Sequence, residues 1–124
     1  MSTSIKSFEE IDAWKASREL ARFVYGAINQ NEYFRKDYRL SNQIQGAAIS
    51  TMSNIAEGFA RRSNKEFIQF LFISKSSAAE IQSQLYVALD QHYIDEATFN
   101  MIYAQAEKVS KLNSGFIKYL RTKI

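Results

Sequence analysis

The stretch QIQGAAISTMSNIAEGFARRSNKEFIQFLFISKSSAAEIQSQ, which runs from Gln43 to Gln84, decides the fold of this 124-residue chain. It contains two helical patterns, joined between Gly58 and Ser63. We expect Gly58 to help end the first helix, and the capping box of Ser63 and Glu66 to start the next. The apolar face of the first helix consists of Ile44, Ala47, Ala48, Thr51, Ile55 and Phe59. The sequence therefore predicts two long helices that meet at a short turn.

A polar stripe runs beside that apolar face. A carboxylate beside weak donors, without histidine or cysteine, makes no activated nucleophile, so we expect no catalytic residue in it. We interpret the stripe as structural, with hydrogen bonds between helices and an ion pair from Glu57 to Arg61 or Arg62. Contact with a ligand is the alternative. The stripe consists of Gln43, Ser50, Asn54, Glu57 and Arg61, at helical spacing.

The helix that follows carries two apolar lines. The main one begins at Phe67, and the second lies about 100° away around the helix. Because a surface helix of a monomer buries one face, a second line needs a partner, either a neighbouring helix or another subunit. We predict that the protein is not a monomer. The residues assigned to this oligomer interface are Ile68, Phe72, Ala79 and Tyr86.

Amphipathic patterns also precede and follow this stretch. Ser7 and Glu10 form a capping box for the first helix, and Gly115 in the last helix suggests close packing or a slight bend. We expect helices at about 8–30, 36–61, 64–90 and 96–122, with a loop from Asn29 to Arg35. The predicted fold is all-α, a single domain over residues 1–124 with an antiparallel up-down-up-down four-helix bundle.

A fairly specific motif lies at the centre of the chain, with looser matches around it. The motif is Asn54-Ile55-Ala56-Glu57-Gly58. The surrounding matches are Trp14, Gln43-Ile44, Ala47-Ala48, Ser50, Arg62-Ser63, Lys65-Glu66-Phe67, Phe70-Leu71, Ser77, Glu80-Ile81 and Leu85. With them the chain, from Phe8 to Leu120, resembles the four helix bundle protein family, first described as encoded in intervening sequences of bacterial 23S ribosomal RNA genes. The chain departs from that family at Gln45-Gly46, where two arginines are usual, at Met52, where proline is common, and at Ser76, where glycine is common.

The resemblance implies a bacterial four-helix bundle that assembles as a homo-oligomeric ring. The expected subunit number is five, because members of the family and the related accessory proteins of diversity-generating retroelements form pentamers. The number therefore comes from the resemblance and not from the pattern of residues.

Composition indicates the compartment and the absence of cofactors. The chain has no cysteine, which excludes disulfides and thiolate metal sites. His92, the single histidine, is expected to be a surface or packing residue, and we predict no metal site and no cofactor. The N-terminal residues MSTSIKSFEE lack the apolar run of a signal peptide, and no segment has the apolar length of a membrane helix. We therefore expect a cytoplasmic protein with no membrane partner.

The distribution of charge predicts a basic end. Residues 35–66 hold six basic and three acidic side chains, and residues 101–124 hold five and one. In the predicted bundle the first helix start, the second turn and the last helix end lie together. The residues expected to contact nucleic acid there are Arg61, Arg62, Lys65, Lys118, Arg121 and Lys123. Tyr119 is the only aromatic residue expected off the core near this end, so sequence preference should be poor.

Two hypotheses about function remain open. The first is a non-enzymatic homo-oligomeric protein whose basic end contacts RNA or DNA. The second is a structural or protein-binding scaffold without a nucleic-acid role, in which the basic residues complement helix dipoles and maintain solubility. The salt dependence of binding separates them, because only phosphate contacts release counterions.

Overall fold

The structure is a computed structural model that describes residues 5–124. Residues 1–4 lie outside the described residues. The predicted domain and the N-terminal stretch MSTSIKSFEE both begin with these four residues. The described chain forms a short 3-10 helix, η1 (Phe8–Glu10), and the helices α1 (Asp12–Asn29), α2 (Glu32–Lys36), α3 (Tyr38–Phe59), α4 (Asn64–Asp90) and α5 (Glu96–Arg121). It contains no strand over that range, which confirms the all-α prediction.

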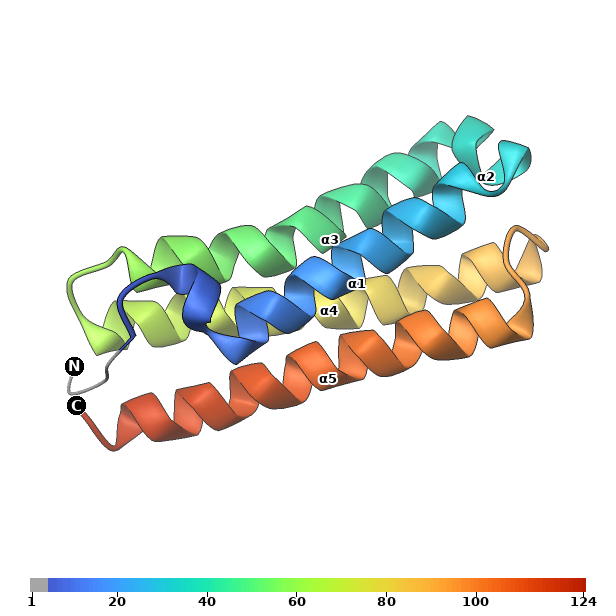
Figure 1. The fold of residues 1–124 in the computed structure, drawn as a ribbon. Helices are drawn as coiled ribbons and strands as arrows, with labels where there is room; N and C mark the ends of the chain where they lie inside the picture. The colour runs from blue at the N-terminus through green and yellow to red at the C-terminus, as the bar shows by residue number, and fades with distance from the viewer. Residues whose placement is uncertain (1–4) are drawn as a thin grey trace.

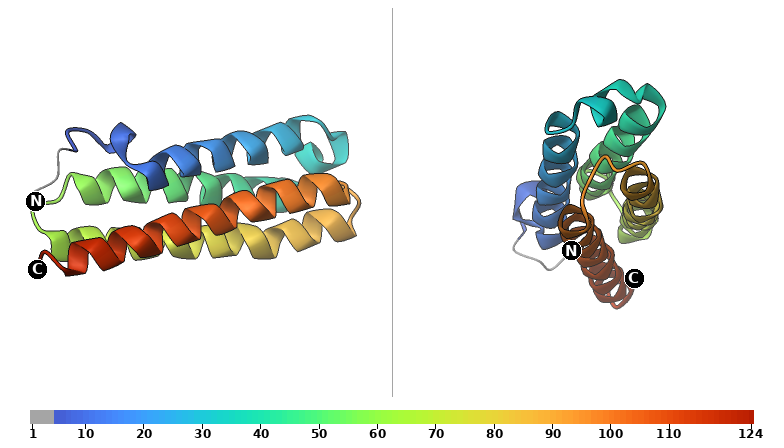
Figure 2. Two further views of the ribbon diagram at one scale, coloured as in Figure 1. Left: turned by 60° about the horizontal axis from the view of Figure 1, so that its bottom comes forward. Right: turned by 90° about the vertical axis from the view of Figure 1, so that its right-hand side faces the viewer.

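The four long helices lie side by side as a helical bundle (Figure 1). The helix α4 packs against α3 and α5, and α1 packs against the same two helices. The start of the described chain, the α3–α4 turn and the C-terminus lie at one end, which we call the terminal end (Figures 1 and 2). The helix α2 and the α4–α5 turn lie at the other, the α2 end. Within residues 5–124, no helix is long and apolar enough to cross a membrane.

The capping box at Ser7 starts a shorter helix than predicted. The Glu10 carboxylate accepts hydrogen bonds from the backbone N–H groups of Lys6 and Ser7, at 2.7 and 3.0 Å. The helix that it caps is η1, because Ile11 adopts an extended backbone with ψ of 124°. The long helix α1 therefore begins at Asp12, with Ile11 turned into the core.

The predicted loop from Asn29 to Arg35 contains a helix instead. The side chain of Asn31 accepts a hydrogen bond from the backbone N–H of Phe34 at 2.9 Å, which caps α2. Phe34 is buried and stacks on Tyr93, so this one-turn helix covers the core at the α2 end. The tertiary contact of Phe34 stabilises a segment that is too short to be helical alone.

The structure gives Gly58 a packing role and shows no close packing at Gly115. Gly58 lies inside α3, which ends at Phe59. A Cβ atom at Gly58 would lie 2.7 Å from Cδ1 of Phe67 and 2.8 Å from Cβ of Phe70, so the glycine permits close approach of α3 and α4. At Gly115 a Cβ atom would meet nothing within 4 Å, so no close packing occurs there.

The core consists of two apolar clusters with a polar layer between them. The α2-side cluster contains Leu20, Ile44, Ile81 and Ile102 among its buried residues. The terminal-side cluster contains Ile11, Ala13, Ile55, Phe67, Ile68, Leu71, Ile117 and Leu120. The polar layer takes one fully buried residue from each long helix, namely Ser17, Thr51, Ser74 and Asn113.

Candidate functional site

All six predicted contact residues lie at the terminal end and are exposed. Arg61, Arg62 and Lys65 come from the α3–α4 turn and the first turn of α4, and Lys118, Arg121 and Lys123 come from the end of α5. The bundle therefore gathers cations from two segments that are far apart in the sequence. In Figure 1 the two segments that carry these cations, the green α3–α4 turn and the red C-terminal end, lie on the same side of the molecule.

One of the six cations is neutralised by a neighbour. Arg61 forms an ion pair with Glu57 at 2.9 Å, and both side chains are about half exposed. Such a pair one helical turn apart stabilises a protein by about 0.3–0.5 kcal/mol. Within residues 5–124, the other five cations form no ion pair. The end also carries four carboxylates, those of Glu9, Glu10, Glu57 and Glu66. Because the six cations outnumber them, the surface is net basic but not uniformly so.

Aromatic rings lie beside three of these cations. The guanidinium carbon of Arg61 is 4.8 Å from the ring centre of Phe70, and that of Arg121 is 5.6 Å from the ring centre of Phe72. The ammonium nitrogen of Lys123 is 5.3 Å from the ring centre of Tyr119. Phe72 is 41% exposed and Tyr119 38% exposed. The prediction that Tyr119 is the only aromatic residue near this end outside the core is therefore wrong.

The α2 end also carries basic residues. The count of charges over residues 35–66 combined them with the basic residues of the α3–α4 turn, which lie at the terminal end. Arg35, Lys36 and Arg39 lie at the α2 end, so half of the basic residues of segment 35–66 belong to the opposite end. Lys36 forms an ion pair with Glu32 at 2.7 Å. The carboxylates at this end are Glu32, Asp37, Asp90, Asp95 and Glu96, so they outnumber the cations there.

The outward face of α5 carries a lysine stripe of which the predicted contact residues included only Lys118. Lys108, Lys111 and Lys118 are exposed and lie at spacings of three and seven residues, which puts them on one face. Their helical spacing in the sequence was the signal that could have identified the stripe. It leads from the terminal end toward the middle of the bundle.

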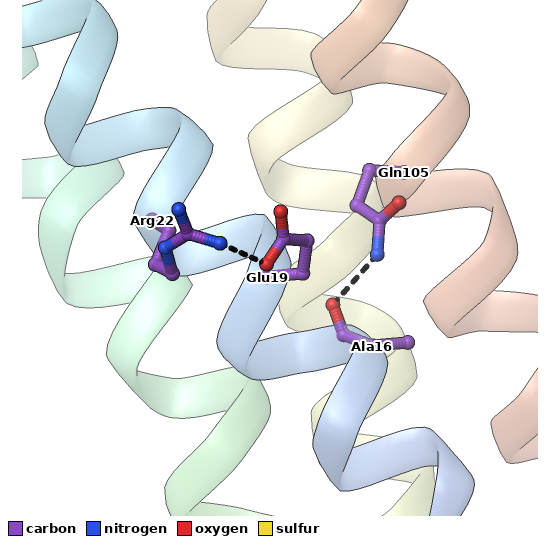
Figure 3. Close-up of polar contacts among 4 residues, drawn as sticks. All are labelled: Ala16, Glu19, Arg22 and Gln105. Carbon is purple, nitrogen blue, oxygen red and sulfur yellow. Dashed lines mark hydrogen bonds and ion pairs between the residues drawn. The ribbon is translucent and has the colours of Figure 1, made fainter.

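The helix α1 lies next to this stripe and is itself rich in charge. Gln105 of α5 donates a hydrogen bond to the backbone carbonyl of Ala16 at 2.9 Å, which joins the two helices (Figure 3). On the neighbouring turn of α1, Arg22 pairs with Glu19 (Figure 3). Lys15 and Arg18, also on α1, are exposed and form no ion pair within residues 5–124.

The outward face of α4 is mostly apolar, with the exposed Glu80 toward one side of it. Phe72, Ala79 and Tyr86 of the predicted oligomer interface are exposed. The fourth residue, Ile68, is 8% exposed and belongs to the terminal-side cluster, so its assignment to this surface is wrong. That cluster includes Ile117 and Leu120 of α5, which the pattern of α4 alone could not reveal. Exposed residues on or beside the same face are Ile73, Ser76, Glu80, Ser83 and Val87.

The polar stripe of α3 makes mostly local hydrogen bonds. The hydroxyl groups of Ser50 and Ser77 lie 2.8 Å apart and join α3 to α4. Asn54 donates to the backbone carbonyl and the hydroxyl of Ser50 at 2.9 Å, within α3. Gln43 is exposed. Two residues of the stripe therefore act as predicted. Ser50 makes the hydrogen bond between helices, and Glu57 makes the ion pair near the turn.

Two surface hollows flank the ends of the bundle. One, of about 520 Å³, lies between the first described residues and α5, and Ile5, Ile11, Phe116 and Tyr119 are among the residues that line it. The other, of about 670 Å³, lies at the α2 end beside His92, whose φ of 61° is left-handed. There Tyr93 donates a hydrogen bond to Asp37 at 2.9 Å, and this bond raises the pKa of the Tyr93 phenol. Within residues 5–124, no three side chains of metal-ligating type cluster.

Comparisons with known proteins agree on one family. A sequence model of the family described as 23S rRNA-intervening sequence protein matches residues 9–115. A crystal structure of a protein of unknown function from the S23 ribosomal protein family of Bacteroides thetaiotaomicron is 26% identical, with a TM-score of 0.75. The match covers 86% of this chain and 98% of that one. The search of curated proteins gave no match.

Proposed function

The chain belongs to the 23S rRNA-intervening sequence protein family, and on that premise we propose that it is a non-enzymatic homo-oligomer that contacts RNA or DNA through its terminal end. The observation that carries the proposal is the gathering of six exposed cations from the α3–α4 turn and the end of α5. Lysine and arginine beside a phosphate backbone gain affinity mainly by releasing counterions, and this requires no catalytic machinery.

The lysine stripe of α5 extends the proposed contact along the bundle. Lys108 and Lys111 continue the row that Lys118 begins at the terminal end. An elongated row of cations matches a linear chain of phosphates better than a compact cluster does. The carboxylates of the α2 end repel such a chain, so the terminal end and the α5 face form the preferred approach.

The outward face of α4 is the proposed surface of self-association. Burying one large apolar side chain stabilises an assembly by about 1.5–3 kcal/mol, and Phe72, Tyr86 and Val87 are each more than two-fifths exposed in the single chain. The proposed interface centres on Ala79, Tyr86 and Val87, and Phe72 lies at its terminal margin, where the side of its ring next to Arg121 stays open. We propose an up-down-up-down bundle that assembles as a ring of five subunits. The alternation of turns between the two ends supports the topology, and the family resemblance supports the number. A ring would repeat the basic end and strengthen weak contacts through multivalency.

We assign no catalytic residue and no cofactor to the protein, and we place it in the cytoplasm. The side chains of Ser50, Asn54 and Glu57 are engaged in hydrogen bonds and an ion pair that suit a structural role. We also propose that the oligomer binds another protein as a further partner.

The alternative is a structural or protein-binding scaffold without a nucleic-acid role. The acidic residues of the terminal end favour it, because Glu9, Glu10, Glu57 and Glu66 reduce the local positive potential. In that case Lys118 and Arg121 would serve mainly to complement the dipole of α5.

Titration of labelled RNA and DNA at several salt concentrations tests the choice. The variant Arg62→Glu/Lys65→Glu/Lys118→Glu changes three exposed cations without an ion pair in residues 5–124. We expect it to lose about tenfold or more in affinity and to show a smaller salt slope than the native protein. The control at the α2 end is Arg35→Glu/Lys36→Glu/Arg39→Glu, which makes the same change of net charge and should bind more nearly as the native protein does. Equal losses in both variants, or no binding at low salt, would favour the scaffold.

A further inference from the structure

We propose that the terminal end selects an unpaired nucleic-acid strand over a duplex, by stacking bases on aromatic rings that lie beside its cations. This inference rests on the proposed function and adds the class of nucleic acid. It starts from the three cation–aromatic pairs, Arg61 with Phe70, Arg121 with Phe72 and Lys123 with Tyr119.

The rings are accessible as well as close to charge. Phe72 and Tyr119 expose 41% and 38% of their surface, although a phenylalanine on a helix is ordinarily buried. Each ring has a cation within 6 Å of its centre, which is the distance of a cation–π contact. A cation in this position holds the ring at the surface and marks where a phosphate would bind.

The pairs follow the rim of the bundle end instead of forming one flat patch. Phe70 and Phe72 are two residues apart on α4, which puts them on opposite sides of that helix. Tyr119 and Arg121 are likewise on opposite sides of α5, and the exposed Lys118 precedes them. The order around the rim is therefore Phe70, Phe72 with Arg121, Lys118, and Tyr119 with Lys123. An extended strand, which presents bases at regular intervals, can follow such a path.

The chemistry of the pairs distinguishes the two classes of nucleic acid. In a duplex the bases are stacked on one another inside the helix, so phosphates and groove edges are what a protein reaches. An unpaired strand offers the faces of its bases, which stack on aromatic rings and on planar guanidinium groups. Arg61 and Arg121 can thus lie between a ring and a base, whereas in contact with a duplex Phe72 and Tyr119 would gain nothing.

Fluorescence anisotropy on the full chain tests the inference. The probes are labelled RNA and DNA strands of about 12 nucleotides, within the range that single-strand binding domains cover, and the same strands annealed to their complements. The variants Phe72→Leu and Tyr119→Leu remove a ring and keep every charge. The control is Tyr33→Leu, an exposed tyrosine of α2 at the opposite end. Light scattering on each variant separates loss of binding from loss of assembly, because Phe72 also lies on the outward face of α4.

We expect tighter binding of the single strands than of the duplexes. Each ring variant should lose about fivefold or more in single-strand affinity, which corresponds to ~1 kcal/mol, with an unchanged salt slope and unchanged duplex affinity. Equal affinity for both forms, or ring variants that bind as tightly as Tyr33→Leu, would overturn the inference and leave the proposed function standing. Absence of binding to every probe at low salt would overturn both.

Discussion

The side-chain amide of Asn113 on α5 donates a hydrogen bond to the hydroxyl oxygen of Ser74 on α4, at 2.9 Å and with both residues fully buried. The Ser74 hydroxyl in turn donates to the backbone carbonyl of Thr51 on α3, at 2.8 Å. Three helices are therefore joined by one chain of hydrogen bonds through the centre of the bundle. The amide oxygen of Asn113 has no hydrogen-bond partner among the residues that the structure describes. A buried acceptor in that state costs roughly 1–3 kcal/mol.

Substitution of Asn113 should separate the effects of polarity and charge. Asn113→Leu removes the unpartnered oxygen and should unfold at a temperature close to or above that of the native protein. Asn113→Asp places an unpaired carboxylate in the core and should lose about 3–5 kcal/mol at pH 7. Burial would raise the folded-state pKa of this carboxyl, so the loss should diminish as the pH falls toward the unfolded value of about 3.9. Circular dichroism melts at several pH values measure this, and an Asn113→Asp variant of native stability at pH 7 would contradict the burial.

Gly58 should tolerate no Cβ atom, because of its contacts with Phe67 and Phe70. Gly58→Ala should destabilise the protein by about 1–3 kcal/mol through overpacking, although alanine favours a helix by ~1 kcal/mol. Gly46, on the same helix, is the matched control, since a Cβ atom there would meet nothing within 4 Å. Gly46→Ala should be neutral or stabilising. Urea unfolding of both variants checks the prediction, and equal stabilities would show that α3 and α4 can separate at the turn.

Ala79 should report on assembly through the outward face of α4. The native protein should have several times the 14.3 kDa mass of one chain by light scattering coupled to size exclusion. Ala79→Glu places a charge on the apolar face and should reduce that mass. Ala104→Glu is the control, because Ala104 is also an exposed alanine in the middle of a long helix. A native protein that is monomeric at tens of micromolar would refute self-association.

Glu57 should affect binding more than stability. Its carboxylate is about half exposed and pairs with Arg61 on its own helix. Glu57→Ala should therefore lower stability by less than about 0.5 kcal/mol. It also frees Arg61 and removes a negative charge, so affinity for nucleic acid should rise at low salt. Decreased affinity with unchanged stability would make Glu57 a functional contact.

Asp95 should make stability depend on pH through the cap of α5. Its carboxylate accepts a hydrogen bond from the backbone N–H of Thr98 at 2.8 Å, and this bond lowers the pKa of Asp95. A group with a lowered folded-state pKa contributes stability at neutral pH that is lost as the pH falls through that pKa. Asp95→Asn keeps a capping side chain without the charge, so its melting temperature should fall less in acid than that of the native protein.

The sequence predicts helix ends well where a local cap adjoins a long periodic pattern. The bounds of α4 agree with the predicted 64–90, because Ser63 accepts from the backbone N–H of Glu66 at 3.1 Å as its capping box requires. The helix α2 was missed because the burial of Phe34 against Tyr93 decides it, and that contact joins distant parts of the chain.

Contacts between helices limit what could be predicted of the site. Ile68 is buried in a cluster that includes Ile117 and Leu120 of α5, and Phe72 is exposed although it lies one turn further along the same line. Thr51 was counted with the apolar residues of its helix, and its periodicity correctly placed it inside. The polar layer that it shares with Ser74 depends on Asn113, whose position across the bundle no local pattern reveals. The cation–aromatic pairs of Arg61 and Arg121 likewise depend on which helices are neighbours.

The division of the core has a consequence for local unfolding. The candidate surface rests on the terminal-side cluster, which has fewer buried apolar residues than the α2-side cluster. Amide hydrogens of the terminal half should therefore exchange with solvent through partial openings of lower free energy than those of the other half. A strand that binds only the closed form would slow that exchange in proportion to its concentration over its Kd. Hydrogen-exchange mass spectrometry would then show the terminal end acquiring protection on binding, while the α2 end exchanges at its original rate.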